Sequence, residues 1–386
     1  MKMIIGNIKR NNKLIFDTNG HPLVLASIGA SQTEDSIEEE VRKAVMAEKY
    51  GADIIIDHTL TPNHYVLQKR VLESTNIPVS SIAVYDLASM KLFNNKKAFN
   101  KDDVINGIKS KAELGIDLMT IHAGVLYEDI NYFKNNGRII SCTSRGGTMV
   151  IKNMMETHEE NYYWTCFDEI LDIAKQYNIT ISLGTTFRPA NISDAVNMNE
   201  MYWKEVERNA VLVKKAQGKG VNIMVEGIGH CPIDMIPDVV KKTKKICHDA
   251  PYRVLTVATD CALGFDHVSS AIAASAAVMA GANCITAVTR SEHLGLPRFE
   301  DVKEAITSAR IAAHCGYIAR THDYSKDIAM AKERNEVGCK GAIDKSIIPE
   351  ITKEELKKCK IDDEKKCTMC GSFCALKSSD EIQKGV

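Results

Sequence analysis

The sequence lacks an excess of charge of either sign. Its 49 lysine and arginine residues nearly balance its 50 aspartate and glutamate residues, which leaves a formal net charge of −1. Proteins that bind nucleic acid through its phosphates usually carry a strongly basic surface. The balance argues against a nucleic acid partner, whereas small anionic ligands remain compatible with local basic sites.

The sequence also lacks long hydrophobic runs. No apolar stretch approaches the roughly 20 residues that a transmembrane helix requires, and Met1–Gly6 is too short for a signal peptide. We therefore expect no membrane insertion and a cytoplasmic location. Without an export signal, the 12 cysteines indicate reduced thiols rather than disulfides, which fits an anaerobic host.

A third absence is the G-x-G-x-x-G fingerprint, which does not follow the first predicted strand. Short apolar runs instead alternate eight times with stretches of helical periodicity. The predicted strands are Leu23–Ile28, Asp53–Thr59, Pro78–Val84, Asp117–Ala123, Ile179–Gly184, Asn222–Glu226, Arg253–Ala258 and Cys284–Val288. The predicted helices are Ser36–Tyr50, Asn63–Ser74, Asp102–Leu114, Tyr127–Asn135, Glu156–Tyr177, Asn199–Gln217, Pro237–His248, Ser269–Ala280 and Phe299–Arg320, with a further strand expected at Arg138–Cys142.

Eight strand–helix units without a polar linker predict an α/β protein with a (β/α)8 barrel, a TIM barrel. A doubly wound open sheet is the alternative. We expect an N-terminal lead-in at 1–21, the catalytic barrel at 22–324 and a C-terminal arm at 325–386, where charge rises and strands vanish.

Polar residues recur where the predicted strands end, which is where barrel enzymes place their chemistry. His122 ends the fourth strand, Glu226 the sixth, and His230 and His293 lie just beyond strand ends. Neutral imidazoles at His230 and His293 could bind one divalent metal ion, zinc or iron. Glu226 and Glu292 are candidates to hydrogen-bond a substrate or to orient these imidazoles.

Two further stretches suit an anion. Ser144, Arg145 and Gly146, followed by a second glycine, offer a hydroxyl, a guanidinium group and flexible amides that could bind a phosphate, although an ordinary turn has the same composition. Arg188, after the fifth strand, is a second candidate for an anion contact.

Three cysteines, Cys367, Cys370 and Cys374, lie within eight residues near the end of the sequence. Thiolates at this spacing favour an iron–sulfur cluster or a zinc ion. A structural zinc site needs a fourth ligand from elsewhere, whereas a cluster can leave one iron open. A small zinc knuckle in the arm is the alternative.

Taken together, these motifs resemble the ThiC family of radical S-adenosylmethionine enzymes. The resemblance extends from about Val24 to Cys374. It is sharpest at Thr120–Val125, Ser144–Gly147, Glu226–His230, Asp260, Asp266–His267, Glu292–Pro297, His314 and Cys367–Cys374.

The resemblance implies a lyase in which Cys367, Cys370 and Cys374 bind a [4Fe-4S] cluster whose open iron chelates S-adenosyl-L-methionine. The implied substrate is 5-aminoimidazole ribonucleotide, with its phosphate on the Ser144–Gly147 turn and with Tyr85, His122 and Glu226 at catalytic substrate-pocket positions. His230 and His293 match the metal-binding histidines. A homodimer, possibly a sister paralogue subunit, and a reductant such as flavodoxin or ferredoxin are the implied partners.

Departures from the family motifs gather around the implied substrate pocket. Ser27 replaces Asn, the stretch Asp57–Thr61 replaces D-L-S-T-G, Ser80–Tyr85 replaces G-T-V-P-I-Y, Thr185 replaces Asp, and the cysteine spacing is C-x2-C-x3-C instead of C-x2-C-x4-C. We therefore expect 5-hydroxybenzimidazole, the lower ligand of anaerobic cobamides (vitamin B12 relatives), as the product. The alternative is the phosphomethylpyrimidine of thiamine biosynthesis.

Two interpretations outside this chemistry also remain open. One is a metal-dependent barrel lyase, aldolase or hydrolase that uses His230 and His293. The other is a non-catalytic accessory paralogue that binds the ribonucleotide or a sister subunit.

Overall fold

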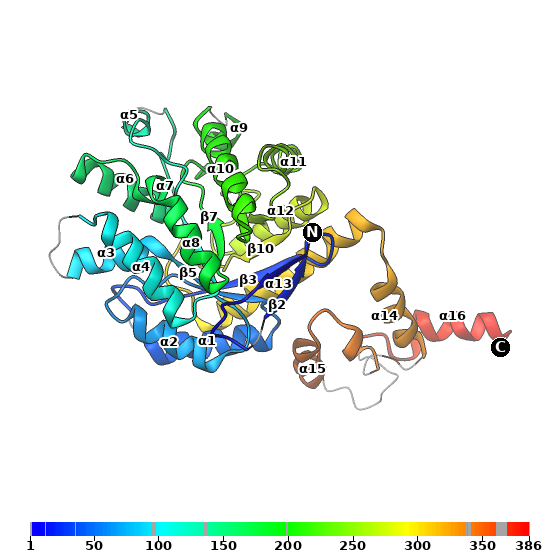
Figure 1. Ribbon diagram of the computed structural model, residues 1–386. Helices are drawn as coiled ribbons and strands as arrows, with labels where there is room; N and C mark the ends of the chain where they lie inside the picture. The colour runs from blue at the N-terminus through cyan, green and yellow to red at the C-terminus, as the bar shows by residue number, and fades with distance from the viewer. Residues whose placement is uncertain are drawn as a thin grey trace. The chain divides into compact units, whose positions relative to one another are not determined.

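The computed structural model describes residues 2–11, 13–34, 36–93, 98–134, 137–197, 200–336, 338, 341–359 and 369–385. The chain forms two compact units, Met1–Arg320 and Thr321–Val386. Figure 1 shows the elements in chain order.

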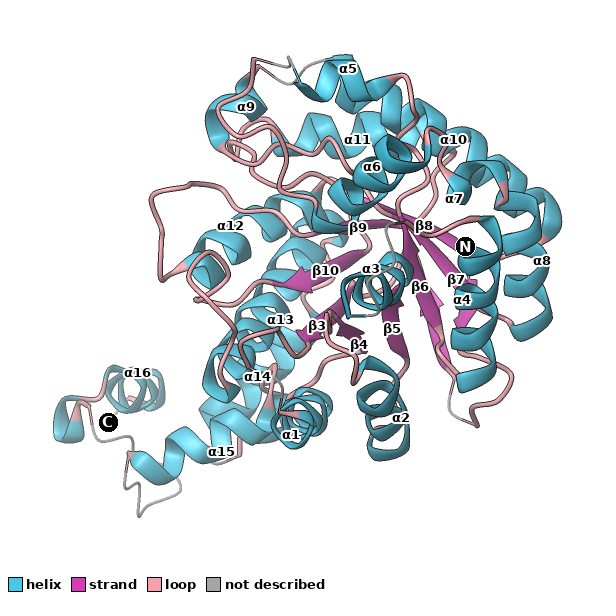
Figure 2. Ribbon diagram, turned by 90° about the vertical axis from the view of Figure 1, so that its left-hand side faces the viewer, coloured by secondary structure: helices cyan, strands magenta, loops and turns pink. Residues whose placement is uncertain are grey.

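The first unit is a closed parallel barrel, which confirms the fold class that the sequence predicts. Its eight strands pair in the order β10-β3-β4-β5-β6-β7-β8-β9, and Figure 2 shows them as an inner ring enclosed by helices. The strands are β3 (Leu23–Ile28), β4 (Ile54–Asp57), β5 (Val79–Ile82), β6 (Leu118–Ile121), β7 (Thr180–Leu183), β8 (Ile223–Glu226), β9 (Tyr252–Val254) and β10 (Cys284–Ala287).

Helices surround the strands of the barrel (Figure 2). They are α1 (Ile37–Lys49), α2 (His64–Ser74), α3 (Ala83–Phe93), α4 (Lys101–Leu114), α5 (Asp129–Lys134), α6 (Arg145–Thr157), α7 (Tyr162–Thr165), α8 (Phe167–Tyr177), α9 (Ile192–Val196), α10 (Glu200–Lys219), α11 (Ile236–Ile246), α12 (Asp266–Met279) and α13 (Phe299–Thr321). Local signals set their ends: α4 begins at a capping box formed by Asn100 and Asp103 and ends at Gly115, which adopts φ 108°.

A hairpin that the sequence did not predict closes the amino-terminal end of the barrel. Its strands, β1 (Lys2–Ile5) and β2 (Leu14–Asp17), are antiparallel. Met3, Ile5 and Phe16 join the buried cluster formed by the first inward-facing residues of the barrel strands. The hairpin was missed because its two apolar runs are short and lie in a polar segment.

On five of the barrel strands the inward-facing residues change from apolar to polar along the strand. Side chains on one face of a strand recur every second residue, so Leu25 and Ser27 both face the barrel interior. The same step leads from an apolar to a polar residue on four other strands, in the pairs Ile56–His58, Leu118–Thr120, Met224–Glu226 and Cys284–Thr286. The apolar half forms the core, and the polar half lines a cavity at the carboxyl ends of the strands.

Four local predictions are wrong. No strand forms at 138–142, although these residues are described, because the backbone N–H groups of Ile139 and Ile140 donate to the carboxylate of Asp194. The stretch expected as a turn at Ser144 is the start of α6, and the expected helix Glu156–Tyr177 is divided among α6, α7 and α8. The third predicted strand ends early, because α3 begins directly after β5.

The second unit contains short helices. They are α14 (Ser325–Glu336), the 3-10 turn η1 (Ile343–Lys345), α15 (Pro349–Lys358), the 3-10 turn η2 (Gly371–Phe373) and α16 (Ala375–Lys384). Within this unit, η1 packs against α14 and α15. In the described parts of both units, no helix combines the length and hydrophobicity needed to cross a membrane.

Candidate functional site

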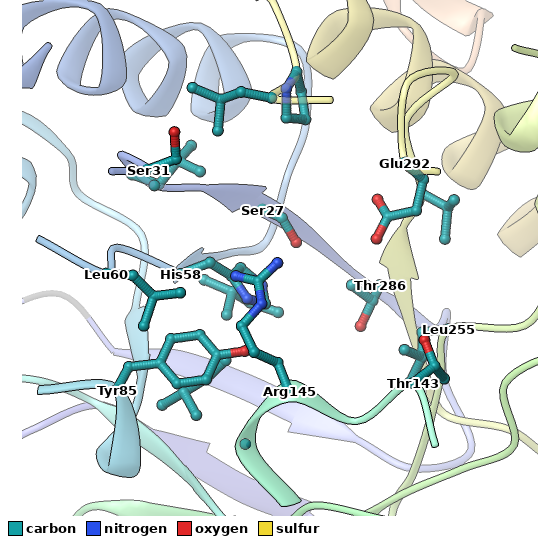
Figure 3. A pocket seen from close by; sticks show the side chains of 18 of the residues that line it. Ser27, Ser31, His58, Leu60, Tyr85, Thr143, Arg145, Leu255, Thr286 and Glu292 are labelled. Atoms are coloured by element: carbon teal, nitrogen blue, oxygen red, sulfur yellow. The ribbon is translucent and has the colours of Figure 1, made fainter. Parts of the chain in front are cut away.

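The carboxyl ends of the barrel strands surround a cavity of about 820 Å³. Its wall includes residues from all eight strands or the loops that follow them, and Figure 3 shows part of this lining. Nine residues predicted for the site from the sequence line it: Tyr85, His122, Ser144, Arg145, Gly146, Arg188, Glu226, His230 and His293. The barrel therefore brings together candidates that are more than 200 positions apart in the sequence.

Glu226, the last residue of β8, is held between two arginines. Arg253 Nη2 donates to Glu226 Oε1 over 2.6 Å, and Arg188 Nη1 donates to Oε2 over 3.1 Å. The backbone N–H of Thr185 also donates to Oε2, over 3.1 Å. Although burial alone would raise the pKa of Glu226, the two guanidinium groups lower it to about 2. The side chain is therefore a fixed carboxylate that can accept hydrogen bonds but cannot act as an acid near neutral pH.

Both arginines have N–H donors that are not yet used in hydrogen bonds within the described residues. Nε of Arg188, and Nε and Nη1 of Arg253, are buried without a hydrogen-bond partner among the described residues. Arg188, expected as an anion contact, therefore supports Glu226 with one nitrogen while another remains available. Because two guanidinium groups face one carboxylate, these three side chains together carry a net positive charge.

His122 follows β6 and is 4% exposed. Its ring lies between Gly146 and Gly184, where a Cβ on either glycine would overlap ring atoms. Burial, assisted by Arg188 and Arg253, lowers the pKa of His122 to about 4. Its Nδ1 atom has no partner among the described residues, so a neutral imidazole with a free nitrogen borders the cavity.

Tyr85, in the first turn of α3, lies near two other polar side chains. Its ring centroid is 6.1 Å from that of His58, and the Arg145 guanidinium carbon lies 5.6 Å from the Tyr85 centroid. Figure 3 shows these three side chains in the same part of the cavity. Burial raises the pKa of the Tyr85 phenol, so it remains a neutral hydrogen-bond donor.

Ser144 is the N-cap of α6, and its hydroxyl accepts a hydrogen bond from the Gly147 N–H over 3.2 Å. The hydroxyl is thus engaged within the protein. A Cβ at Gly147 would overlap the Thr186 side chain, and a Cβ at Gly146 would overlap the His122 ring. The absence of side chains brings the positive end of α6 to the cavity wall, an arrangement suited to an anion.

His230 and His293 form a pair with ring centroids 5.2 Å apart. Their Nδ1 atoms contact carboxylates: His230 lies 2.6 Å from Asp260 Oδ1, and His293 lies 3.1 Å from Asp266 Oδ1. A carboxylate on Nδ1 leaves Nε2 as the free nitrogen, which is how metal-binding imidazoles are usually oriented.

This donor set fits a divalent metal with two protein ligands. Within the described residues, no group of three His, Cys, Asp or Glu side chains is placed to share one ion. Substrate or water oxygen atoms would have to complete the coordination sphere. Glu292, the other carboxylate considered from the sequence, lies on the same loop as His293 and lines the cavity.

The cysteine motif belongs to the second unit. Cys370 and Cys374 flank the turn η2, while Cys367 lies outside the described residues. Cys370 is exposed and Cys374 is partly buried, and neither thiol is in a disulfide. Two accessible thiols on either side of one tight turn suit a sulfur-ligated metal centre.

Arg253 is the clearest omission from the sequence-based site. A charged residue in the short apolar run Tyr252–Val254 was a detectable signal, because a buried strand rarely carries an unpaired charge. His58 lies in the stretch Asp57–Thr61 that departs from the family motif, and the sequence analysis gave it no role. Asp260 and Asp266 lie in motifs that resemble the family, but their pairing with the histidines depends on the course of loops, which the sequence did not show.

Comparisons with known proteins find relatives along almost the whole chain. Residues 2–381 match the model of the Radical SAM ThiC family. A phosphomethylpyrimidine synthase from Thermoanaerobacter sp. (strain X514) is 38% identical over 93% of this chain and 84% of its own length. One from Geobacter metallireducens is 36% identical over 95% of this chain and 87% of its own length. Among solved structures, a dihydropteroate synthase from Coxiella burnetii superposes with a TM-score of 0.46 at 11% identity, over 80% of this chain and 97% of that one.

Proposed function

Because the chain belongs to the radical SAM ThiC family, we propose that it converts 5-aminoimidazole ribonucleotide to the phosphomethylpyrimidine of thiamine biosynthesis. The observation that carries this proposal is the coincidence of nine expected site residues on one cavity wall. Relatives named phosphomethylpyrimidine synthase, at 36–38% identity over most of both chains, support this product.

The cavity offers an anion site and a polar site for the two ends of a ribonucleotide. The start of α6, with Arg145 and the amides near Gly146, would bind the phosphate. Glu226 would accept hydrogen bonds from N–H groups of the substrate, because it remains ionised. His122 Nδ1 and the Tyr85 phenol would supply neutral hydrogen-bonding groups around the ring that reacts.

His230 and His293 would bind a zinc or iron ion through Nε2, with Asp260 and Asp266 fixing the two rings. Such an ion would hold electronegative substrate atoms at the cavity wall. Cys370 and Cys374, with Cys367 from the undescribed segment, would hold a [4Fe-4S] cluster. When bound, the cluster and S-adenosyl-L-methionine supply a 5′-deoxyadenosyl radical that starts the rearrangement.

A second candidate product is 5-hydroxybenzimidazole, and the cavity wall contains the observation that favours it. Ser27 and His58 line the cavity where the family motifs carry Asn and Leu, and Thr185 next to Glu226 stands where they carry Asp. These changes leave the metal and cluster residues in place. They therefore fit the same initiating chemistry followed by a different rearrangement.

The partners proposed for the enzyme follow from its family. They are a second copy or a sister subunit, and an electron donor such as flavodoxin or ferredoxin.

The product is tested by anaerobic reconstitution of the cluster, followed by addition of reductant, S-adenosyl-L-methionine and 5-aminoimidazole ribonucleotide. Mass spectrometry should detect the phosphorylated hydroxymethylpyrimidine together with 5′-deoxyadenosine. Hydroxybenzimidazole in its place would establish the second candidate. If neither heterocycle forms, with or without a sister subunit, the proposed activity is wrong.

A further inference from the structure

His58 places a polar atom without a partner on the wall of the cavity. Its Nε2 is buried and has no hydrogen-bond partner among the described residues. Burial of a polar nitrogen without a partner is unfavourable. The protein thus keeps this imidazole in an unfavourable environment, as expected for a group that meets a ligand.

The backbone around His58 holds this side chain in place. The His58 N–H donates to the carbonyl of Ile28 over 2.8 Å, continuing the pairing of β3 with β4. Gly29, at φ +143°, packs so closely on the His58 peptide that a Cβ there would overlap it. Ile54 and Ile56 face the barrel interior. Because every second residue of a strand points to the same side, His58 also points inward, into the cavity.

The imidazole remains neutral in this position. Burial, with Arg145 and Arg253 close enough to repel a second cation, lowers the pKa of His58 to about 3. A phosphate in this cavity would bind the charged donors of Arg145, Arg188 and Arg253 in preference to a neutral imidazole, because charge-assisted hydrogen bonds are stronger. It is well suited to a neutral polar group.

The surroundings of His58 also suit a flat heterocycle. The Tyr85 ring lies 6.1 Å away between centroids, Leu60 adds an apolar side chain, and Arg145 borders the same region (Figure 3). Aromatic and aliphatic surface around a single polar atom is the usual composition of a site for an aromatic ring with one polar edge.

We propose that His58 binds the aminoimidazole base of the ribonucleotide through Nε2 and thereby determines how this substrate is positioned. The inference rests on the proposed substrate. It does not depend on which of the two products is formed. Ser27, on the neighbouring strand β3, stands where the family motifs carry the larger amide of Asn. Both side chains line the cavity from paired strands, so Ser27 occupies less of its volume than Asn would, while His58 adds a polar group at the end of β4.

The test is equilibrium binding to the full-length protein, measured by calorimetry with 5-aminoimidazole ribonucleotide and with ribose 5-phosphate, which lacks the base. Replacing His58 with Leu should weaken ribonucleotide binding roughly 3- to 10-fold, as loss of one hydrogen bond predicts, and should leave ribose 5-phosphate binding unchanged. His58→Gln, which can place a polar atom near the position of Nε2, should recover most of the affinity, whereas His58→Asn should not.

The controls separate this inference from the proposed function. His64→Leu removes an imidazole outside the cavity and should bind both ligands as the unaltered protein does, and thermal melts show that each variant is folded. Equal affinity of His58→Leu and the unaltered protein for the ribonucleotide would overturn the inference alone. Equal weakening for both ligands would also overturn it, because it would place His58 at the phosphate or ribose. Failure of the unaltered protein to bind the ribonucleotide would instead contradict the proposed substrate.

Discussion

Asp266 determines which nitrogen His293 presents to the cavity. Its Oδ1 lies 3.1 Å from His293 Nδ1, and its side chain is 3% exposed. Asp266→Asn removes the negative charge and allows the amide to turn its NH₂ toward the ring. We expect zinc affinity to fall about 10-fold or more, as for other residues that orient metal-binding histidines.

This prediction is checked by competition with a chromogenic chelator. Asp238→Asn, an exposed acidic residue in the first turn of α11, is the matched control and should bind zinc normally. Unchanged affinity in Asp266→Asn would show that this carboxylate does not orient a metal ligand.

Gly146 is required for the position of His122. A Cβ at Gly146 would overlap the His122 ring, so Gly146→Ala must displace either the ring or the start of α6. We expect a loss of about 1–3 kcal/mol in the free energy of unfolding and weaker ribonucleotide binding. Denaturant titration and calorimetry measure the two effects.

Gly218 provides the opposite case within α10. An added Cβ there would meet nothing within 4 Å, so Gly218→Ala should stabilise the protein by roughly 0.4–1 kcal/mol. If both alanine variants behaved alike, the close contact at Gly146 would not be what requires a glycine.

The residues of the site were predictable to different degrees. His122 and Glu226 were found because each ends an apolar run, and parallel strands end at the same edge of a barrel. The links between Glu226 and Arg253, or between His293 and Asp266, are set by strand order and loop paths. No local pattern in the sequence carries that information.

At the scale of elements, the loop after β7 depends on α10. Glu205 of α10 accepts hydrogen bonds from the N–H groups of Thr186 and Phe187, each over 2.7 Å. Burial raises the pKa of Glu205 from 4.5 to about 7, even though these hydrogen bonds act in the opposite direction. Helix and loop are therefore coupled through one titratable carboxyl group.

The raised pKa predicts how stability varies with pH. Between about pH 4.5 and 7 the folded state keeps a proton on Glu205 that the unfolded state releases, so the free energy of unfolding falls as the pH rises through this range. Urea unfolding at a series of pH values should show this decline in the unaltered protein. In Glu205→Gln this decline of the free energy of unfolding with pH should be absent. An identical pH profile in the variant would contradict a raised pKa at Glu205.

The elements themselves followed largely from apolar periodicity, with strands predicted one to four residues too long at several ends. The sequence analysis missed all of α6 before Glu156, because Gly146 and Gly147 are poor helix formers. Contacts of these glycines with His122 and Thr186 override that preference. The strand expected at 138–142 failed for a similar reason, since Asp194, more than 50 positions away, binds its backbone.

At the scale of the whole molecule, the cavity and the cysteine motif belong to different compact units. Cys370→Ala should therefore abolish cluster binding, seen as loss of iron and of visible absorbance, while leaving barrel stability and ribonucleotide binding intact. Cys359→Ala, an exposed thiol in the same unit, is the control and should retain the cluster. A colourless protein that holds zinc at Cys370 would favour the alternative of a structural zinc site.

The barrel could be predicted from the sequence because its eight units follow one another in the order in which they pair. The domain boundaries expected at 21 and 324 remain predictions. The hairpin β1–β2 is part of the barrel unit through contacts between residues far apart in the sequence, which periodicity cannot show.

The central claim is that this chain is a radical enzyme acting on an aminoimidazole ribonucleotide. The most direct test measures 5′-deoxyadenosine formed by the reduced, cluster-loaded protein with and without 5-aminoimidazole ribonucleotide. We predict that the ribonucleotide strongly increases 5′-deoxyadenosine formation in the unaltered protein and that Cys370→Ala forms none. The claim would be contradicted if the protein did not cleave S-adenosyl-L-methionine, or if the ribonucleotide did not increase the amount cleaved.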